Sequence, residues 1–395
     1  MISKKMEPFV KNSSVVRALF EEGLKMAEKY GKENVFDFSL GNPNVPAPKE
    51  VRDAIIDVLS SEDPNKIHGY MPNQGFPETR AAVANDLNQR FGTDFSEKDI
   101  IMSVGAASAL NVTLKTILDP EDEVVVFAPY FLEYGNYVKN YDGKLIVIPA
   151  NIDGGFMPDV KELEKVITPK TKAVLINNPN NPTGIVYSEA VIKEIAAVLE
   201  RKQTEFNTVI YIISDEPYRE LVYDGIEVPF VAKHYDNTII CYSYSKSLSL
   251  PGERIGYIAV PSQSDEAEDF VAAAITATRI TGAVNAPSLI QLAIAKCTDC
   301  KADVDYYHRN GKLLYDELTN LGFECTKPQG AFYLWVKSPD KDEKEFVNEG
   351  KKQHILMVPG SSFACPGYVR IAYCVSYEMI QNSLPHFEEL AKVYK

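Results

Sequence analysis

Ala173-Val-Leu-Ile176 is a short apolar run, followed by Asn177-Asn-Pro-Asn-Asn-Pro-Thr-Gly184 and then by a segment from Ser188 to Lys202. The run is apolar at consecutive positions, which predicts a strand buried on both faces. The cluster of Asn, Pro and Gly predicts a turn. The last segment repeats apolar residues at helical spacing: Val191, Ile192, Ile195, Val198 and Leu199. Strand, turn and helix in this order form a βα unit.

The same kind of apolar run recurs through the middle of the chain. Four further runs are Val124-Val-Val-Phe127, Leu145-Ile-Val-Ile148, Val209-Ile-Tyr-Ile-Ile213 and Thr238-Ile-Ile-Cys241. Each has four or five residues, many of them β-branched, and helical patterns lie between several of them. The sequence therefore predicts an α/β fold, with a large domain built on a mostly parallel sheet between helices.

The two ends of the chain have a different pattern. Residues 11–31 predict one amphipathic helix that ends at Gly31. A long helical stretch runs from Pro287 towards Gly322, and residues 331–336 and 369–374 resemble strands. We expect a large domain of residues 45–288 and a smaller α+β domain of residues 1–44 and 289–395.

The composition is that of a globular protein with two domains: 395 residues, 45% hydrophobic and 24% charged. The net charge of −14 argues against nucleic acid or an anionic membrane as the partner, because phosphates require a basic face. No apolar stretch approaches a membrane span, and the first residues have no secretory h-region. Six scattered cysteines, with Cys297-Thr-Asp-Cys300 as the one C-x-x-C, predict reduced thiols in a cytoplasmic protein and no metal site.

Lys246 lies in the most informative segment, Cys241-Tyr-Ser-Tyr-Ser-Lys-Ser247, which continues to Arg254. An isolated lysine in such a loop is usually a surface residue. Here Ser243, Ser245 and Arg254 together make an anion site beside the amine. A phosphate site next to a lysine that can form a Schiff base describes a pocket for pyridoxal phosphate.

Asp215 ends a second buried run in Ile212-Ile-Ser-Asp-Glu-Pro-Tyr218. A buried carboxylate requires a partner, and the pyridine nitrogen of pyridoxal phosphate would supply one. Tyr218 could reach the phenolic oxygen of the same cofactor. The alternative for Asp215 is a helix N-cap, which by itself is about as common.

Two further segments fit the same pocket. Asn181 follows a predicted strand, at the edge where parallel sheets bind ligands, although Asn-Pro-Gly clusters form turns everywhere. The residues Ser103-Val-Gly-Ala-Ala-Ser108 are small and open a helical pattern that runs to about Ile117. The backbone N–H groups of such a helix start bind phosphate well.

These motifs, in this order, resemble the class I/II aminotransferases of the fold-type I pyridoxal phosphate enzymes, aspartate aminotransferase among them. The resemblance runs from Gly41-Asn-Pro43 to Arg370 and implies a sheet of the seven-stranded type. It implies that Lys246 is the Schiff-base lysine and general acid/base, that Asp215 pairs with the pyridinium nitrogen, and that Tyr218 and Asn181 contact the phenolic oxygen. Further cofactor contacts would come from Gly105, Ala106, Ala107, Phe131, Ser243, Ser245 and Arg254.

The resemblance also assigns residues for the substrate and for a second subunit. Arg370 would bind the substrate α-carboxylate, with Gly41, Asn42 and Asn181 beside it. Tyr70 would reach the phosphate of a partner subunit, which implies a homodimer with shared active sites. Some family members carry a hydroxyl residue at the position of Ala107, so the backbone must serve alone or Ser108 substitutes.

The implied activity is a ping-pong transamination from an L-amino acid to a 2-oxo acid. By family frequency, the substrates would be aspartate and 2-oxoglutarate, or a broad acidic and aromatic range. Candidates for a cation that binds a side-chain carboxylate include Arg279 and Lys11. A β-eliminating C–S lyase on the same scaffold is the nearest alternative, and a non-catalytic binding protein is a more distant one.

Overall fold

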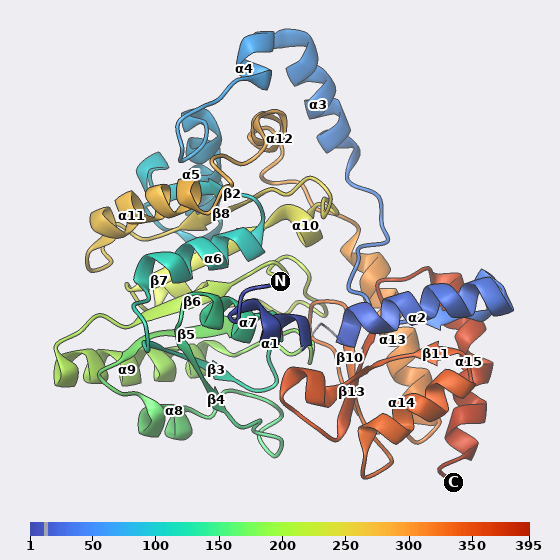
Figure 1. The fold of residues 1–395 in the computed structure, drawn as a ribbon. Helices are drawn as coiled ribbons and strands as arrows, with labels where there is room; N and C mark the ends of the chain where they lie inside the picture. The colour runs from blue at the N-terminus through green and yellow to red at the C-terminus, as the bar shows by residue number, and fades with distance from the viewer. Residues whose placement is uncertain (12–14) are drawn as a thin grey trace.

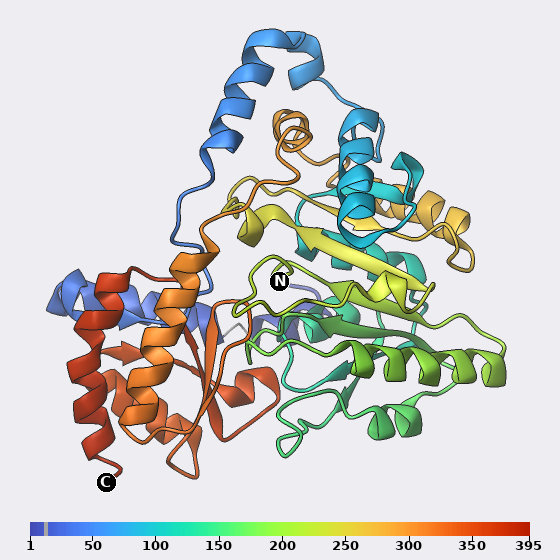
Figure 2. The ribbon, with the colours of Figure 1, turned by 180° about the vertical axis from the view of Figure 1, so that it is seen from behind.

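The computed structural model describes residues 1–11 and 15–395 of the chain. A large sheet with its helices occupies one side of the molecule, and the C-terminal helices and strands gather with α2 (Val15–Tyr30) on the other side (Figure 1). Figure 2 shows the C-terminal helices, in orange and red, side by side and away from the green helices of the large sheet. Among the described residues, no helix is long and apolar enough to cross a membrane.

The large sheet has seven strands. In spatial order these are β2 (Ile100–Ser103), β8 (Gly256–Ala259), β7 (Thr238–Ser243), β6 (Tyr211–Asp215), β5 (Thr171–Asn177), β3 (Glu123–Phe127) and β4 (Lys144–Ile148). β8 runs antiparallel to both of its neighbours, and every other neighbouring pair is parallel. The predicted mostly parallel sheet is therefore confirmed.

Alternate residues of the central strands enter two different cores. Ala173 and Leu175 of β5 pack with α6 (Ala106–Ile117), α7 (Glu133–Asn140) and α11 (Ala267–Ile280). Val174 and Ile176 pack on the other face with α8 (Val160–Val166) and α9 (Glu189–Phe206). Both faces are covered, which explains why the run is apolar at consecutive positions. At the edge, β4 departs from this pattern, because Val147 is 39% exposed.

Four helices cover the β2 side of the sheet: α3 (Lys49–Ser61), α4 (Pro64–His68), α5 (Pro77–Phe91) and α12 (Ser288–Ile294). Val51 and Ala54 of α3 pack in one core with Ile290 and Ala293 of α12. Nearby, α10 (Tyr244–Ser247) is a single short turn that directly follows β7.

The predicted long helix after Pro287 is wrong in one respect, because the structure divides it into two. α12 ends at Ile294, and α13 begins at Val304 with the Asp303 side chain accepting from Tyr306 N as its N-cap. Between them the chain turns, with Cys300 N donating to Cys297 O over 3.1 Å. The capping Asp and this turn are local signals that end one helix and start the next.

The smaller part of the molecule contains α13 (Val304–Asn320), α14 (Glu343–Lys352) and α15 (Tyr377–Lys392). They pack on an antiparallel sheet in the order β12 (Val358–Pro359), β13 (Tyr368–Ala372), β10 (Tyr333–Lys337) and β9 (Cys325–Thr326). β1 (Phe36–Asp37) pairs in parallel with β11 (Ile355–Leu356), which ties the N-terminal part of the chain to the C-terminal part.

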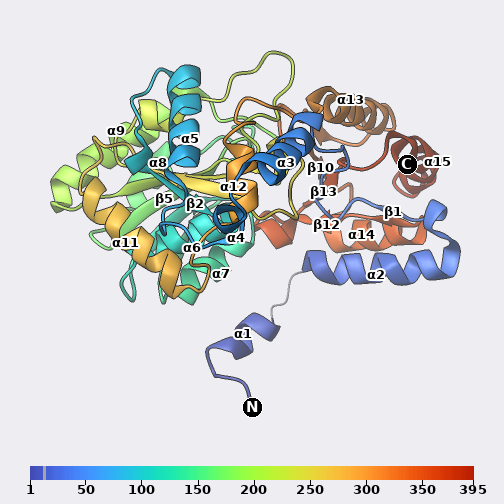
Figure 3. The ribbon, with the colours of Figure 1, turned by 90° about the horizontal axis from the view of Figure 1, so that it is seen from above.

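The predicted helix over residues 11–31 is described in two pieces. α1 (Met6–Lys11) projects from the main body in the view from above (Figure 3), and it contacts α7 through Phe9, whose ring centroid lies 5.7 Å from Lys139 Nζ. α2 ends at Tyr30, before Gly31 with φ +89°. Residues 12–14 lie outside the described part of the chain, as does the side chain of Lys11.

Candidate active site

The carboxyl ends of three adjacent strands bring the predicted residues together. Asn177 ends β5 and is paired in register with Asp215, which ends β6. Asp215 is paired in turn with Cys241 of β7, two residues before Ser243. In parallel sheets these ends form one edge, and ligands bind in the crevice outside it.

Asp215 is a buried carboxylate with one unpaired oxygen. Its Oδ2 accepts a hydrogen bond from the Tyr134 hydroxyl and one of 3.4 Å from Asn177 Nδ2, while Oδ1 is buried and has no partner among the described residues. Burial, reinforced by the charge of Glu216, raises the pKa of Asp215 to about 7, although the Tyr134 hydrogen bond opposes the shift. A protonated nitrogen at Oδ1 would complete the carboxylate's hydrogen bonding.

Lys246 extends from α10 across to the N-terminal part of the chain. Its Nζ donates to the backbone oxygen of Gly41 over 2.6 Å and lies 5.4 Å from the centroid of the Phe332 ring. Burial, together with the positive charges of Arg370 and Arg254, lowers the pKa of Lys246 to about 8. A substantial fraction of neutral amine is therefore present near neutral pH, as a general base requires.

Arg370 reaches the same space from β13. Its guanidinium donates to Asn181 Oδ1 over 3.0 Å and to the backbone oxygen of Ser39 over 2.6 Å, and it lies 4.5 Å from the Tyr333 ring centroid. The third nitrogen, Nε, is buried without a partner. The stacked ring and the two acceptors fix the plane of the guanidinium, the group that binds carboxylates in bidentate fashion.

Tyr218 and Gly41 meet at Tyr333. The hydroxyls of Tyr218 and Tyr333 lie 2.8 Å apart, and burial raises the pKa of Tyr218 well above its usual range. A Cβ at Gly41 would lie 2.1 Å from the Tyr333 hydroxyl oxygen, so this close approach requires glycine.

Hydroxyls, an arginine and a helix start form a second group in the site. The Oγ atoms of Ser243 and Ser245 lie 2.7 Å apart, at the start of α10. Arg254 Nη2 donates to Val104 O over 3.2 Å, next to Gly105, the N-cap of α6 with φ +79°. A Cβ at Gly105 would lie 2.8 Å from that nitrogen, so glycine allows the arginine to approach the helix start.

These groups border one cavity of about 390 Å³. The predicted residues that line it are Gly41, Ala106, Ala107, Phe131, Asn181, Asp215, Tyr218, Ser243, Ser245, Lys246, Arg254 and Arg370. Phe131 packs edge-on against Tyr134, with ring centroids 5.5 Å apart. A larger cavity of about 760 Å³ lies at the amino end of β6 beside Tyr211, and none of the predicted residues lines it.

The predicted residues Gly105, Asn42 and Tyr70 and the alternative Ser108 are not among those that line this cavity, although Gly105 directly precedes the lining residue Ala106. Asn42 is exposed although its neighbour Gly41 lines the cavity, and Ser108 is not among the lining residues. Tyr70 is 93% exposed and also does not line the cavity of its own chain.

Sequence reasoning missed several residues that the fold brings into the site. The Tyr134 hydroxyl donates a hydrogen bond to Asp215. The side chain of Asn177 donates to the backbone oxygen of Asp215 and accepts from the backbone N–H of Asn181. Tyr333 contacts Tyr218 and Arg370. Asn177 had a local signal, because it ends a buried strand as Asp215 does. The two tyrosines are indistinguishable in sequence from packing aromatics.

The residues present fit pyridoxal phosphate. The unpaired Oδ1 of Asp215 suits a protonated ring nitrogen, Lys246 supplies an amine of lowered pKa, and the cluster of Ser243, Ser245 and Arg254 at a helix start suits a phosphate. Among the described residues no cluster of His, Cys, Asp and Glu could hold a metal ion.

Comparisons with known proteins agree with this geometry. The family model "Aminotransferase class I and II" matches residues 33–387. The chain is 31% identical to aromatic-amino-acid aminotransferase 2 of Thermococcus litoralis, over 97% of each chain. An aminotransferase structure from Eubacterium rectale is 46% identical over 100% of this chain and 99% of its own, with a TM-score of 0.97. An aspartate aminotransferase structure from Thermus thermophilus is 27% identical over 99% of both chains, with a TM-score of 0.86.

Transamination is therefore favoured over β-elimination, and over binding without catalysis. Motifs, cavity and relatives all lead to one conclusion: the chain belongs to the class I and II aminotransferases, and it is a pyridoxal phosphate-dependent enzyme that transfers an amino group from an amino acid to a 2-oxo acid.

Proposed function

We propose that the cavity at the end of β5, β6 and β7 is the transamination site, with Lys246 as its acid/base catalyst and Asp215 and Tyr218 as its other catalytic residues. The observation that carries this proposal is the convergence of Lys246, the unpaired oxygen of Asp215 and Arg370 on one cavity of about 390 Å³. Asp215 and Arg370 are buried and Lys246 is partly buried, and ionisable groups in such surroundings cluster at functional sites.

Bound pyridoxal phosphate supplies an aldehyde that condenses with amines and a ring that withdraws electrons from the substrate α-carbon. Lys246 Nζ takes the proton from that carbon, and its lowered pKa keeps enough of the amine neutral. The Asp215 carboxylate holds the ring nitrogen in its protonated form. Tyr218 and Asn181 would bind the phenolic oxygen, and Phe131 would lie against the ring.

The phosphate would be bound by the second group of residues in the site, the hydroxyls, the arginine and the helix start. Ser243, Ser245 and Arg254 supply donors, and Gly105 and the first residues of α6, Ala106 and Ala107, supply backbone N–H groups. Because Ser108 does not line the cavity, the backbone serves alone at the position where other members have a hydroxyl.

Arg370 would bind the substrate α-carboxylate, with Gly41 and Asn181 at its border. Asn181 Oδ1 accepts from Arg370, so a single amide side chain orients the arginine and contacts the cofactor. Asn42 is exposed, so we assign it at most a backbone role beside Gly41.

We propose aspartate with 2-oxoglutarate, or a broad acidic and aromatic range, as the substrates. Among the described residues that line the cavity, the cations are Lys246, Arg254 and Arg370, all with other roles. A side-chain carboxylate would therefore be bound by a cation from outside this cavity, whereas Tyr333 and Phe363 suit an aromatic side chain. The named relatives include both aspartate and aromatic aminotransferases.

A homodimer is part of this proposal, with Tyr70 of each subunit completing the phosphate site of the other. The support is that Tyr70 is almost fully exposed and does not line its own chain's cavity. Exposed apolar side chains on α3, Ile56 and Leu59, offer surface for a partner near it. Mixing Tyr70→Phe with Lys246→Ala subunits tests it, because each hybrid dimer holds one intact site. Activity that does not rise after subunit exchange would exclude shared sites.

We also propose a large domain of residues 45–288 and a small domain of residues 1–44 and 289–395. α12 begins at this boundary, but its side chains pack into the core of the large domain. A cytoplasmic location fits the six free cysteines.

The activity is tested by adding pyridoxal phosphate to the purified protein and following the visible absorption band. Aspartate, glutamate, phenylalanine and tyrosine are then offered singly, and 2-oxoglutarate is added to return the band. Pyruvate and ammonia release from cystathionine measures elimination in the same samples. A band that no amino acid changes, or release of pyruvate as the main product, would overturn the proposal.

A further inference from the structure

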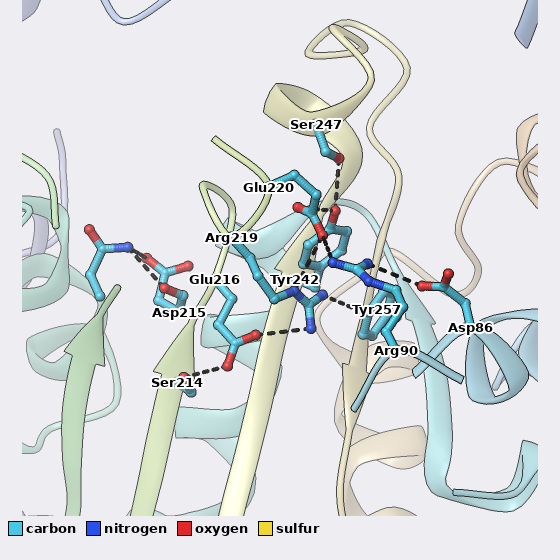
Figure 4. A network of polar contacts seen from close by, with 11 residues as sticks. Asp86, Arg90, Ser214, Asp215, Glu216, Arg219, Glu220, Tyr242, Ser247 and Tyr257 are labelled. Carbon is cyan, nitrogen blue, oxygen red and sulfur yellow. Dashed lines mark hydrogen bonds and ion pairs between the residues drawn. The ribbon is translucent and has the colours of Figure 1, made fainter. Parts of the chain in front are cut away.

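Behind the catalytic edge lies a partly buried ionic network that the mechanism above does not use (Figure 4). Arg219, 4% exposed, pairs with Glu216 at 3.1 Å and with Glu220 at 3.4 Å. Arg90 pairs with Glu220 at 2.8 Å and with Asp86 at 3.2 Å. Arg219, Glu216 and the side chain of Glu220 are buried, whereas the side chain of Arg90 is 28% exposed. Burying three charged groups costs desolvation energy that hydrophobic residues would not, so stability alone is a weak reason for the network.

One arm of the network leads directly to the residue next to the catalytic lysine. The Tyr242 hydroxyl lies 2.7 Å from Glu220 Oε2 and 2.8 Å from Ser247 Oγ, and Ser247 follows Lys246 on α10. Figure 4 shows this chain running from Glu220 through Tyr242 up to Ser247 at the end of the short helix.

The direction of these hydrogen bonds follows from the charge of Glu220. Burial opposes its ionisation, but Arg219 and Arg90 more than offset it and lower the pKa of Glu220. A carboxylate only accepts, so Tyr242 gives it its single hydroxyl proton. Glu220 and Ser247 therefore compete for that proton, and the negative charge favours the charge-assisted bond to Glu220.

The helix that carries Lys246 has little internal support. α10 has four residues, too few to be stable without tertiary contacts. Its first turn is capped by Ser243, and its end is held by Ala302 N, which donates to Ser247 O over 2.7 Å. The Ser247 side chain adds a second contact from that end to a more distant part of the fold, through Tyr242.

We propose that Glu220 acts as a positioning residue for Lys246, through Tyr242 and Ser247. The charge network fixes Glu220, the tyrosine transmits that position to α10, and the helix then aims Lys246 Nζ into the cavity that it shares with Asp215. This inference rests on the proposed role of Lys246.

The test removes one oxygen at a time from the intact holoenzyme. Tyr242→Phe keeps the ring, which lies 4.4 Å from the Arg219 guanidinium, and Ser247→Ala removes only the last link. Each variant should lower kcat about tenfold with little change in KM, and should shift the absorption maximum of bound pyridoxal phosphate. The fraction trapped on Lys246 by borohydride, measured by peptide mass spectrometry, should fall as well. Ser247→Thr, which keeps the hydroxyl, should restore the kcat, the absorption maximum and the trapped fraction of the wild type.

Two comparisons separate positioning from stability. The double variant should lose no more than either single variant, because both cut the same chain. Tyr235→Phe is the matched control: its buried hydroxyl donates to Ile210 O over 2.6 Å, before the amino end of β6. It should lower the melting temperature and leave the spectrum and kcat unchanged.

The proposal is overturned if Tyr242→Phe and Ser247→Ala lower the melting temperature alone and keep the wild-type spectrum, trapping and kcat. If Tyr242→Phe does not fold, Ser247→Ala decides alone. Failure of the proposed function is a different result, because the wild-type protein itself would then show no band and no trapped Lys246.

Discussion

Replacing Asp215 by Asn should make the unfolding free energy of the cofactor-free protein fall less as the pH rises. Burial raises the pKa of Asp215 from 3.8 to about 7 in the folded chain. Between these values the folded state binds more protons than the unfolded state, so this group's contribution to stability is lost as pH rises towards 7. Asn carries no charge and cannot lose stability in this way.

The shift sets the size of the effect. A difference of about 3 pKa units at about 1.4 kcal/mol each gives about 4 kcal/mol as the upper bound at pH 8. Asn also weakens the bond from Tyr134 and buries an N–H group where Oδ1 had no partner, which costs about 1–3 kcal/mol. That cost changes little with pH. The difference in unfolding free energy, variant minus wild type, should therefore rise by about 2–4 kcal/mol from pH 4.5 to 8.

Urea unfolding of both proteins measures this difference, at one fixed protein concentration. The single tryptophan, Trp335, is fully buried and reports by fluorescence, and far-UV circular dichroism checks that both signals change together. Tyr134→Phe is the companion variant. It removes a donor to the carboxylate, so it should destabilise the protein more at pH 8 than at pH 5.

Two results would refute the reasoning. A difference that is flat or falls with pH would mean that burial does not penalise the Asp215 carboxylate. Saturating pyridoxal phosphate should raise the unfolding free energy of the wild type more than that of Asp215→Asn. The wild-type carboxylate gains a protonated partner, so the wild type binds the cofactor more tightly. If the cofactor stabilises Asp215→Asn as much as the wild type, Asp215 does not pair with it.

Three further substitutions and one labelling experiment test the remaining parts of the site. Lys246→Ala should keep the cofactor, seen by absorbance, and lose about 10²–10⁴-fold in kcat; near-normal turnover would exclude it as the base. In the cofactor-free protein, labelling of Lys246 by an amine-reactive reagent should rise with pH to a midpoint near 8, and a midpoint above 10 would contradict the burial argument. Arg370→Lys should raise KM for amino acids about 10–100-fold with little change in cofactor affinity, since one ammonium cannot bind a carboxylate in bidentate fashion. Gly105→Ala should weaken binding of pyridoxal phosphate in an equilibrium titration, because its Cβ would lie 2.8 Å from Arg254 Nη2, and unchanged affinity would remove this helix start from the phosphate site.

Local patterns were enough to predict the sheet, because strands buried on both faces are apolar at consecutive positions. They failed where a local pattern has two readings. The stretch after Pro287 has helical composition throughout, yet Asp303 starts a new helix within it. Val147 continues an apolar run, yet β4 is an edge strand and leaves it partly exposed.

The same distinction, between local sequence patterns and contacts made by packing, applies to the residues of the site. Lys246, Asp215 and Asn181 were predictable because each lies at the end of a buried strand or in the loop or turn that follows one, and the order of the strands brings those ends to one edge. Tyr134, Tyr333 and the arm from Glu220 were not, because their partners lie far away in sequence and only packing brings them within hydrogen-bond distance.

The sequence by itself determined the kind of chemistry: an amine, a carboxylate, a guanidinium and hydroxyls at the ends of buried strands. Only the tertiary structure decided how those groups behave. A pKa depends on burial and on neighbouring charges, so the shifts of Asp215 and Lys246 exist only once the chain has closed around them. The aim of Lys246 is decided in the same way, because a helix of four residues takes its position from whatever packs against it.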